Sequence, residues 1–164
     1  FRRDSRTVAE FKKQIKECTK LERVLMQRYV DWLNTKGKAV YTFEDKGVDN
    51  SGRYIADDAK VTCDPDFVLF KNGKYKGFIE IKHCNPDLPM FHLKLPHVEK
   101  CIAGDICIVN WMGVGTDNPK FCILTPAILS ELLAAGPVVK FKPWGYKPCL
   151  RVMCNNEKIK WQTT

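Results

Sequence analysis

The sequence predicts an α/β protein in which a mixed central β-sheet is flanked by helices. Three observations carry this expectation. Apolar residues recur at steps of three and four over residues 5–36, which is typical of an amphipathic helix. Apolar and polar residues alternate over 66–70 and 77–82 on either side of Asn72-Gly73, which predicts a β-hairpin. An apolar run at 105–111, bounded by glycines, is typical of a buried central strand.

In the first predicted helix a carboxylate interrupts the apolar stripe, which is formed by Val8, Phe11, Ile15, Cys18, Leu25, Tyr29 and Trp32. Glu22 occupies the stripe position between Cys18 and Leu25. One hypothesis is that Glu22 faces a functional site. The other is a capping box, in which the helix breaks at Thr19 and Glu22 bonds back to the backbone there. The start of this helix is basic, with Arg2, Arg3, Arg6, Lys12, Lys13 and Lys16. These residues either bind phosphates or form the solvated face of the helix.

A strand is expected at 39–43, followed by a polar stretch over 44–58 that is rich in Gly, Asp and Asn. We expect a loop or an irregular hairpin in this stretch. Asp57 and Asp58 are secondary acidic candidates within it, because acidic pairs in loops are usually solvated.

The predicted hairpin carries charged groups where strand interiors are ordinarily apolar. Successive strand residues point to opposite faces, so Phe78, Glu80 and Lys82 share one face. Asp66 opens the first strand, and the turn folds its carboxylate back beside this pair. A non-functional alternative remains open, in which Glu80 and Lys82 form a solvent-exposed ion pair that contributes little to stability.

Two carboxylates held close together are costly to ionise unless a cation sits between them. Mg²⁺ accepts carboxylate oxygens and completes its shell with water and substrate phosphate. The Lys82 ammonium would then lie where it could orient an attacking water or stabilise the charge of a transition state.

These residues resemble a known motif. Pro65-Asp66, followed after thirteen residues by Glu80-Ile81-Lys82, is similar to the bipartite motif of the PD-(D/E)xK nuclease superfamily, which includes phage, homing and junction-resolving enzymes. The resemblance implies a restriction-endonuclease-like core over about residues 5–135 and a site that holds Mg²⁺ or Mn²⁺. It implies metal ligation by Asp66, Glu80 and the main-chain carbonyl of Ile81, assistance to the attacking water by Lys82, and a further catalytic carboxylate at Glu22.

After the hairpin, two prolines within 83–89 predict a loop, and a short helix is expected from Phe91 to Ala103. The resemblance implies that Lys94 on this helix reaches the scissile phosphate. A strand at 120–124 and a helix over 125–135 follow.

The last part of the chain, about 136–164, is predicted to be a basic and aromatic extension of one single domain that spans residues 1–164. Three strands are expected within it, at 138–141, 149–154 and 158–161. Its basic and aromatic side chains would bind nucleic acid by stacking on bases or by lying along the backbone: Lys140, Lys142, Trp144, Tyr146, Lys147 and Arg151. An alternative is a loop that packs Trp144 onto the core.

Composition favours a polyanionic partner. The chain has 27 Lys and Arg against 19 Asp and Glu, a formal charge of +8 and a pI near 9.1. Nucleic acid is the commonest partner of such a protein, although positive charge can also serve solubility alone.

Eight cysteines occur, most of them in apolar runs and none in a CxxC pair, so we expect buried free thiols rather than disulfides or structural zinc. We therefore expect an intracellular, reducing compartment, either cytoplasm or a nucleoid or nucleus, with a phage gene as one source. No apolar run approaches a membrane span, no signal-peptide pattern is visible, and residues upstream of Phe1 are expected because the chain does not begin with Met.

Together these features predict a Mg²⁺- or Mn²⁺-dependent endonuclease that acts on DNA. The resemblance also implies a homo-oligomer, because cutting both strands commonly needs two active sites. Two alternatives stay open: a non-catalytic nucleic-acid-binding module on the same fold, and an RNA endonuclease. The cap-cleaving viral RNA endonucleases usually carry an upstream metal-binding His, and here no His precedes His83.

Overall fold

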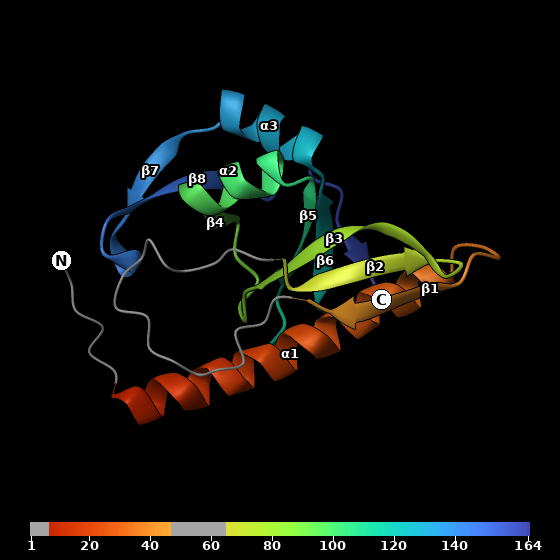
Figure 1. The fold of residues 1–164 in the computed structure, drawn as a ribbon. Coiled ribbons are helices and arrows are strands. Elements are labelled where there is room, and N and C mark those ends of the chain that lie inside the picture. Colours follow the sequence, from red (N-terminus) through yellow and green to blue (C-terminus); the bar gives the residue numbers. More distant parts are fainter. Residues whose placement is uncertain (1–6, 47–64) are drawn as a thin grey trace.

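A six-stranded mixed β-sheet forms the centre of the structure, a computed structural model that describes residues 7–46 and 65–164 (Figure 1). Its strands, in spatial order, are β1 (Tyr41–Asp45), β2 (Phe67–Lys71), β3 (Lys74–His83), β5 (Ile106–Met112), β6 (Lys120–Leu124) and β9 (Gln162–Thr163). β3 and β5 are parallel, whereas the other neighbouring strands are antiparallel. The predicted α/β class with a mixed central sheet is therefore confirmed.

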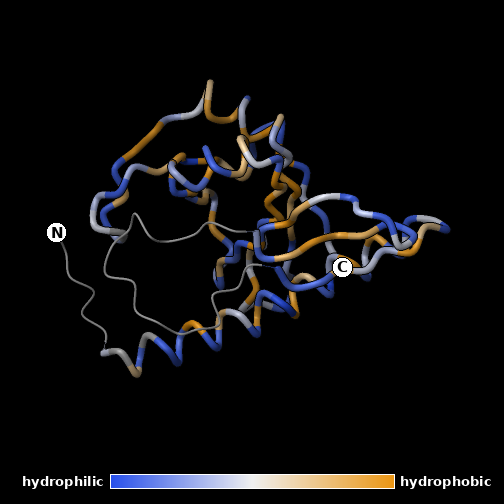
Figure 2. Tube along the Cα trace, in the orientation of Figure 1, coloured by the Kyte–Doolittle hydropathy of each residue, from blue (hydrophilic) through white to orange (hydrophobic). Residues whose placement is uncertain are grey.

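Helices cover both faces of this sheet. α1 (Val8–Asn34) packs against one face, where Leu25, Met26, Tyr29 and Val30 meet buried side chains such as Trp111. α2 (Leu95–Ala103) and α3 (Pro126–Ala135) lie on the other face and share a second apolar core with β5 and β6. In Figure 2 the central strands are largely orange, whereas blue and orange alternate along α1, as expected of a helix that buries one side.

A second, three-stranded antiparallel sheet lies beside α2 and α3 in Figure 1. It consists of β4 (Met90–Lys94), β8 (Lys147–Met153) and β7 (Val138–Phe141), and a short 3₁₀ turn, η2 (Lys142–Trp144), follows β7. One face of this sheet joins the core of α2 and α3 through Phe91, Leu93, Leu150 and Val152. The segment after residue 136 therefore completes a sheet with a strand from the middle of the chain.

The predicted hairpin is present and is closed by a two-residue turn. Asn72 and Gly73 both have positive φ, 51° and 75°, as a type I′ turn requires. The antiparallel register places Phe67 opposite Ile79 and shifts between Leu69 and Phe70. Local sequence chemistry explains the turn, whereas the register shift is a feature that only the structure shows.

The helix expected from Phe91 to Ala103 is wrong in its first part, because Met90–Lys94 forms β4. A helix beginning at Phe91 would place Pro96 in its interior, where the ring and the missing N–H are incompatible with helical hydrogen bonding. Pro96 instead occupies the first turn of α2. Lys94 is thus the last residue of a strand and the N-cap of α2, and not a residue on the helix surface.

The capping box proposed at Thr19 and Glu22 is also wrong. α1 runs without a break through Thr19, and the capping box lies at its start instead, where Thr7 and Glu10 bond to each other's backbone N–H groups. Glu22 is therefore available for other contacts.

The strand expected at 158–161 is not formed. The chain turns here, with the N–H of Ile159 donating to the Asn156 carbonyl at 2.9 Å, and the final strand pairing begins only at Gln162. Ile159 is buried in the core beside α3, and the Trp161 indole donates to the Cys154 carbonyl at 2.8 Å. Burial of these side chains outweighs their local strand preference.

Seven cysteines of the described segments are free thiols, of which Cys101, Cys122 and Cys149 are buried, and Cys63 lies outside the described residues. Asp57, Asp58 and the side chains of Val8, Phe11 and Trp144 lie outside them as well, as do Arg2, Arg3 and Arg6. Within the described segments, no helix is both long and apolar enough to cross a membrane.

Candidate active site

Asp66, Glu80 and Lys82 come together where β2 begins and β3 ends. Continuing the register of Phe67 and Ile79 by one residue places Asp66 opposite Glu80. Asp66 Oδ2 accepts a hydrogen bond from the Ile81 N–H at 2.9 Å, so its carboxylate takes the place of a backbone partner on this edge of β3. The N–H and C=O of a strand residue point to the same edge, so the Ile81 carbonyl also faces the side of β3 on which Asp66 lies.

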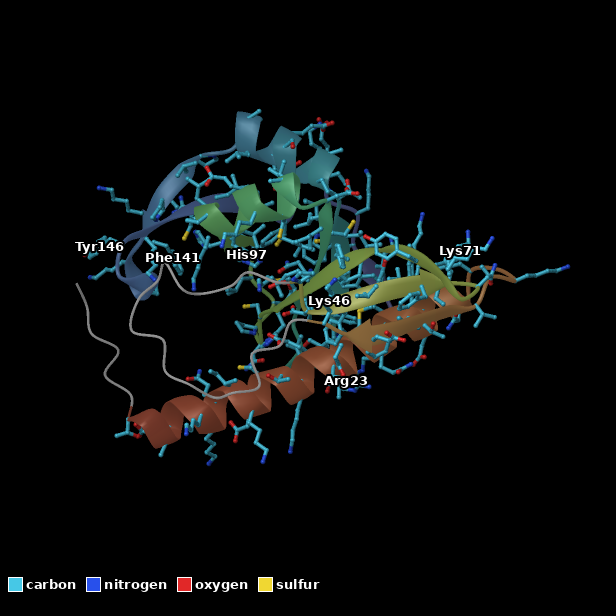
Figure 3. All side chains as sticks on the ribbon, viewed as in Figure 1. Arg23, Lys46, Lys71, His97, Phe141 and Tyr146 are labelled. Atoms are coloured by element: carbon cyan, nitrogen blue, oxygen red, sulfur yellow. The ribbon has the colours of Figure 1, made fainter. Side chains whose placement is uncertain are left out.

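Glu80 is the centre of this cluster and is only 5% exposed. Its Oε1 accepts a hydrogen bond from the Lys82 ammonium, which lies two residues along the same face of β3. His97, on the first turn of α2, places Nε2 3.2 Å from the same oxygen. The Glu80 carboxylate is therefore contacted from its own strand and from α2, whose His97 is labelled in Figure 3.

Two of the carboxyl groups have an unusually high affinity for protons. Burial and the neighbouring charge of Glu80 raise the pKa of Asp66 to about 6, against the opposing effect of Lys82. Burial and the charge of Asp66 raise the pKa of Glu22 to about 7, although Glu22 belongs to α1. Glu22 is thus electrostatically part of the cluster, with three carboxyl groups sharing one nearby ammonium.

Glu80 and Lys82 have pKa shifts that favour their charged forms. Burial opposes the charge of Glu80, but the contacts with His97 and Lys82 outweigh it and lower the pKa of Glu80. Burial likewise opposes the charge of Lys82, but the carboxylates of Glu80 and Asp66 outweigh it and raise the pKa of Lys82. This pair is consequently ionised, and the excess negative charge of the cluster depends on Asp66 and Glu22.

Four of the residues predicted to contact nucleic acid are Lys94, Lys142, Lys147 and Arg151, and all four belong to the second sheet or to the turn within it. Lys94 ends β4, Lys147 begins β8 and Lys142 lies in η2, and all three are exposed. Arg151 lies in β8 and is half-buried, with its Nε donating to His92 Nε2 at 3.2 Å. They therefore lie apart from the carboxyl cluster, which belongs to the main sheet and α1.

Three further residues near the cluster were not singled out from the sequence. His97 contacts Glu80, and its buried Nε2 makes no aligned hydrogen bond within the described segments. Asn110 is the β5 partner of Lys82 and is buried, and its Nδ2 likewise lacks an aligned partner there. Lys46 donates its backbone N–H to the Asp66 carbonyl at 2.9 Å and holds its ammonium 4.5 Å from the centre of the Phe78 ring. Of these three residues, only Asn110 could have been noticed in the sequence, because its amide side chain interrupts the apolar run of β5.

No protein-family model, curated protein or solved structure matches this chain. The site must therefore be interpreted from its own chemistry. In the described part of the chain, no group of three or more His, Cys, Asp and Glu side chains forms a ready-made metal site. The carboxyl oxygens of Asp66, Glu80 and Glu22 are nevertheless donors of the type that hard divalent cations prefer.

Proposed function

We propose that this protein is a metal-dependent endonuclease of the PD-(D/E)xK type, which hydrolyses phosphodiester bonds in DNA. The observation that carries the proposal is the gathering of Asp66, Glu80, Lys82 and Glu22 into one partly buried cluster. Carboxylates brought together from a hairpin and a helix destabilise one another, which a purely structural site would avoid.

The donor set fits Mg²⁺ or Mn²⁺. Mg²⁺ is ordinarily held by one or two protein carboxylates, with water and substrate phosphate as its other ligands, so a complete protein cage is not needed. Asp66, Glu80 and the Ile81 carbonyl would hold the ion, and Glu22 would add a further carboxylate. When bound, the ion would supply Lewis-acid polarisation of the phosphate and a more acidic water.

The protein's own residues account for the remaining requirements of hydrolysis. The Lys82 ammonium is held against Glu80 and keeps its proton, so it can position an attacking water or offset negative charge that develops on the phosphate. His97 acts through Glu80 as a positioning residue, because it touches the carboxylate and belongs to a different element.

The scaffold agrees with the proposal. A long helix, α1, covers one face of the sheet, and α2 connects β4 to β5, which lies parallel to β3 on its far side from β2. This arrangement fixes both halves of the motif on adjacent strands and brings Glu22 to them from the covering helix. We expect a homo-oligomer by analogy with that family, because cutting both strands of DNA commonly needs two active sites.

The charge favours a polyanionic substrate, and DNA is the polyanion of the proposal. The formal charge of +8 attracts polyanions, and Lys94, Lys142, Lys147 and Arg151 would contact phosphates beside the site. An intracellular, reducing location agrees with the seven free thiols of the described segments.

The test is a cleavage assay with supercoiled, duplex, branched and single-stranded DNA in Mg²⁺ or Mn²⁺. Glu80→Gln and Lys82→Ala are each expected to lower the cleavage rate by about 10²-fold or more, because each removes an electrostatic contact with the reacting phosphate or its metal. Lys74→Ala is the matched control, since Lys74 is an exposed lysine at the turn end of the same strand.

Unchanged cleavage in both site variants would refute the mechanism. Salt-sensitive DNA binding without any metal-dependent turnover in the unmodified protein would instead identify a non-catalytic binding module. Cleavage of RNA in preference to DNA, lost in the same two variants, would assign the site to an RNA endonuclease.

A further inference from the structure

The second sheet is unusual in its charge. Its two segments, 90–94 and 138–153, hold five basic residues and no Asp or Glu: Lys94, Lys140, Lys142, Lys147 and Arg151. The chain as a whole is far less one-sided, with 27 basic residues against 19 acidic ones. These two segments therefore carry only positive charge, which attracts a polyanion.

The two faces of this sheet differ. Phe91, Leu93, Leu150 and Val152 turn one face toward the core. Because strand residues alternate, His92 and Arg151 belong to the opposite face, where they are directly paired in the register. This outer face is turned away from the core and carries the half-buried His92 and Arg151 side chains.

Aromatic rings lie among the cations of the outer face. The His92 ring is stacked on Phe141 with centroids 4.1 Å apart and planes 24° apart, and Arg151 donates to His92 at 3.2 Å. Aromatic side chains are platforms on which unpaired nucleic-acid bases stack, and a nearby guanidinium adds a cation–π contribution. The bases of a duplex are stacked on one another, so only an unpaired strand offers its base faces.

Tyr146 adds an exposed ring at the edge of this surface. It is 60% exposed and has a φ of 60°, a left-handed conformation that is unfavourable for a non-glycine residue. Two backbone hydrogen bonds of 3.0 Å hold it there, from Gly145 to Lys142 and from Tyr146 to Phe141. The turn thus maintains a strained residue whose ring points to solvent and not into the core.

The second sheet is joined to the candidate active site through the chain, by β4 and α2. β4 passes directly into α2 at Lys94, and three residues later His97 contacts Glu80. In Figure 3 Tyr146, Phe141, His97 and Lys46 follow one another from the second sheet to the hairpin. A strand leaving the carboxyl cluster would reach this sheet next.

We propose that the outer face of the second sheet binds a single-stranded segment of nucleic acid. Tyr146 and the His92–Phe141 stack receive unpaired bases, while Lys142, Lys147 and Arg151 contact the phosphates. Together with the proposed nuclease function, on which this step rests, the surface specifies the substrate. The substrate would be DNA with an unpaired strand, such as a flap, a branch or a single strand.

The experiment measures dissociation constants by fluorescence anisotropy, in EDTA, for a labelled single strand of about 16 nucleotides and for its duplex. Tyr146→Ala is compared with Tyr75→Ala, since Tyr75 is 59% exposed on the hairpin strand β3 and is thus closely matched. Loss of one base stack is expected to weaken single-strand binding about tenfold in Tyr146→Ala, with duplex binding nearly unchanged. Tyr75→Ala should bind both ligands as the unmodified protein does.

Equal single-strand affinities for the two tyrosine variants would overturn the proposal, as would equal weakening of single-strand and duplex binding in Tyr146→Ala. Because EDTA prevents metal-dependent cleavage, the outcome is independent of catalysis. Tyr146-dependent binding by a protein that never cleaves DNA would retain this surface and reject the nuclease. Cleavage that depends on Lys82, without Tyr146-dependent binding, would do the reverse.

Discussion

The carboxyl cluster and the second sheet are opposites in charge and in burial. The cluster gathers Asp66, Glu80 and Glu22 around one ammonium, and its central carboxylate is 5% exposed. The second sheet has no carboxylate, and its lysines lie at the surface. β4 and α2 join the two regions within a few residues.

Under the proposed nuclease function, this difference corresponds to a division of labour. Buried charges interact strongly and are sensitive to protonation, which suits bond cleavage. Exposed cations interact weakly one by one and are screened by salt, which suits holding a flexible polyanion. Neither region alone would suffice for a nuclease, so each should fail in its own way when mutated.

The largest expected effect separates cleavage from binding. Asp66→Asn should lower the single-turnover cleavage rate by about 10²- to 10³-fold while leaving DNA affinity unchanged or slightly tighter, because it removes a negative charge from the site. Lys142→Ala combined with Lys147→Ala should weaken DNA affinity about tenfold while saturating DNA restores the cleavage rate.

Anisotropy and rapid-quench kinetics measure these two quantities separately. Lys74→Ala combined with Lys76→Ala provides the matched control, with the same loss of charge on the hairpin. A parallel loss of affinity and rate in every variant would show that the two regions act as one site.

A smaller effect is expected at His97, which links the two regions. His97→Ala should weaken Mn²⁺ affinity by about 10- to 100-fold, because the partners of a ligating carboxylate fix its orientation. His97→Gln keeps an N–H donor and should recover part of this loss. Electron paramagnetic resonance of free Mn²⁺ in a titration gives the affinity without any cleavage assay.

Glu99→Ala is the control for this measurement, since Glu99 is exposed on the same helix. If the affinity of His97→Ala equals that of the unmodified protein, His97 has no role in positioning Glu80.

The smallest effect is on stability and depends on pH. Folded Glu22 keeps its proton up to a pKa of about 7, whereas its ordinary value is 4.5, so the folded state binds more protons between these values. The contribution of Glu22 to stability is therefore complete below pH 4.5 and is lost as the pH rises through about 7. Relative to the unmodified protein, metal-free Glu22→Gln should gain on the order of 1 kcal/mol between about pH 4.5 and 8.

Urea unfolding in EDTA at about pH 4.5 and at about pH 8 measures this gain in the free energy of unfolding. Glu17→Gln, an exposed residue of the same helix, should show no change with pH relative to the unmodified protein. Parallel pH profiles for Glu22→Gln and the unmodified protein would place Glu22 outside the cluster.

Much of the site could be predicted from the sequence, because its main parts are local. The Asn72-Gly73 turn closes the hairpin and the two-residue period puts Glu80 and Lys82 on one face, whereas the register shift between Leu69 and Phe70 places Asp66 opposite Glu80. The apolar stripe of α1 similarly marked Glu22 as a residue on the buried side. These are patterns of neighbours within one or two elements.

The sequence by itself thus determined the α/β class, the hairpin and the residues that share its charged face. Only the tertiary structure decided that α1 brings Glu22 to the cluster, that α2 brings His97 to Glu80, and that β4 pairs with β8. His92 and Arg151, which meet in that pairing, are 59 residues apart in the chain. Local periodicity describes which face a residue occupies, but packing of distant elements decides what that face meets, because burial of a shared core selects the partner.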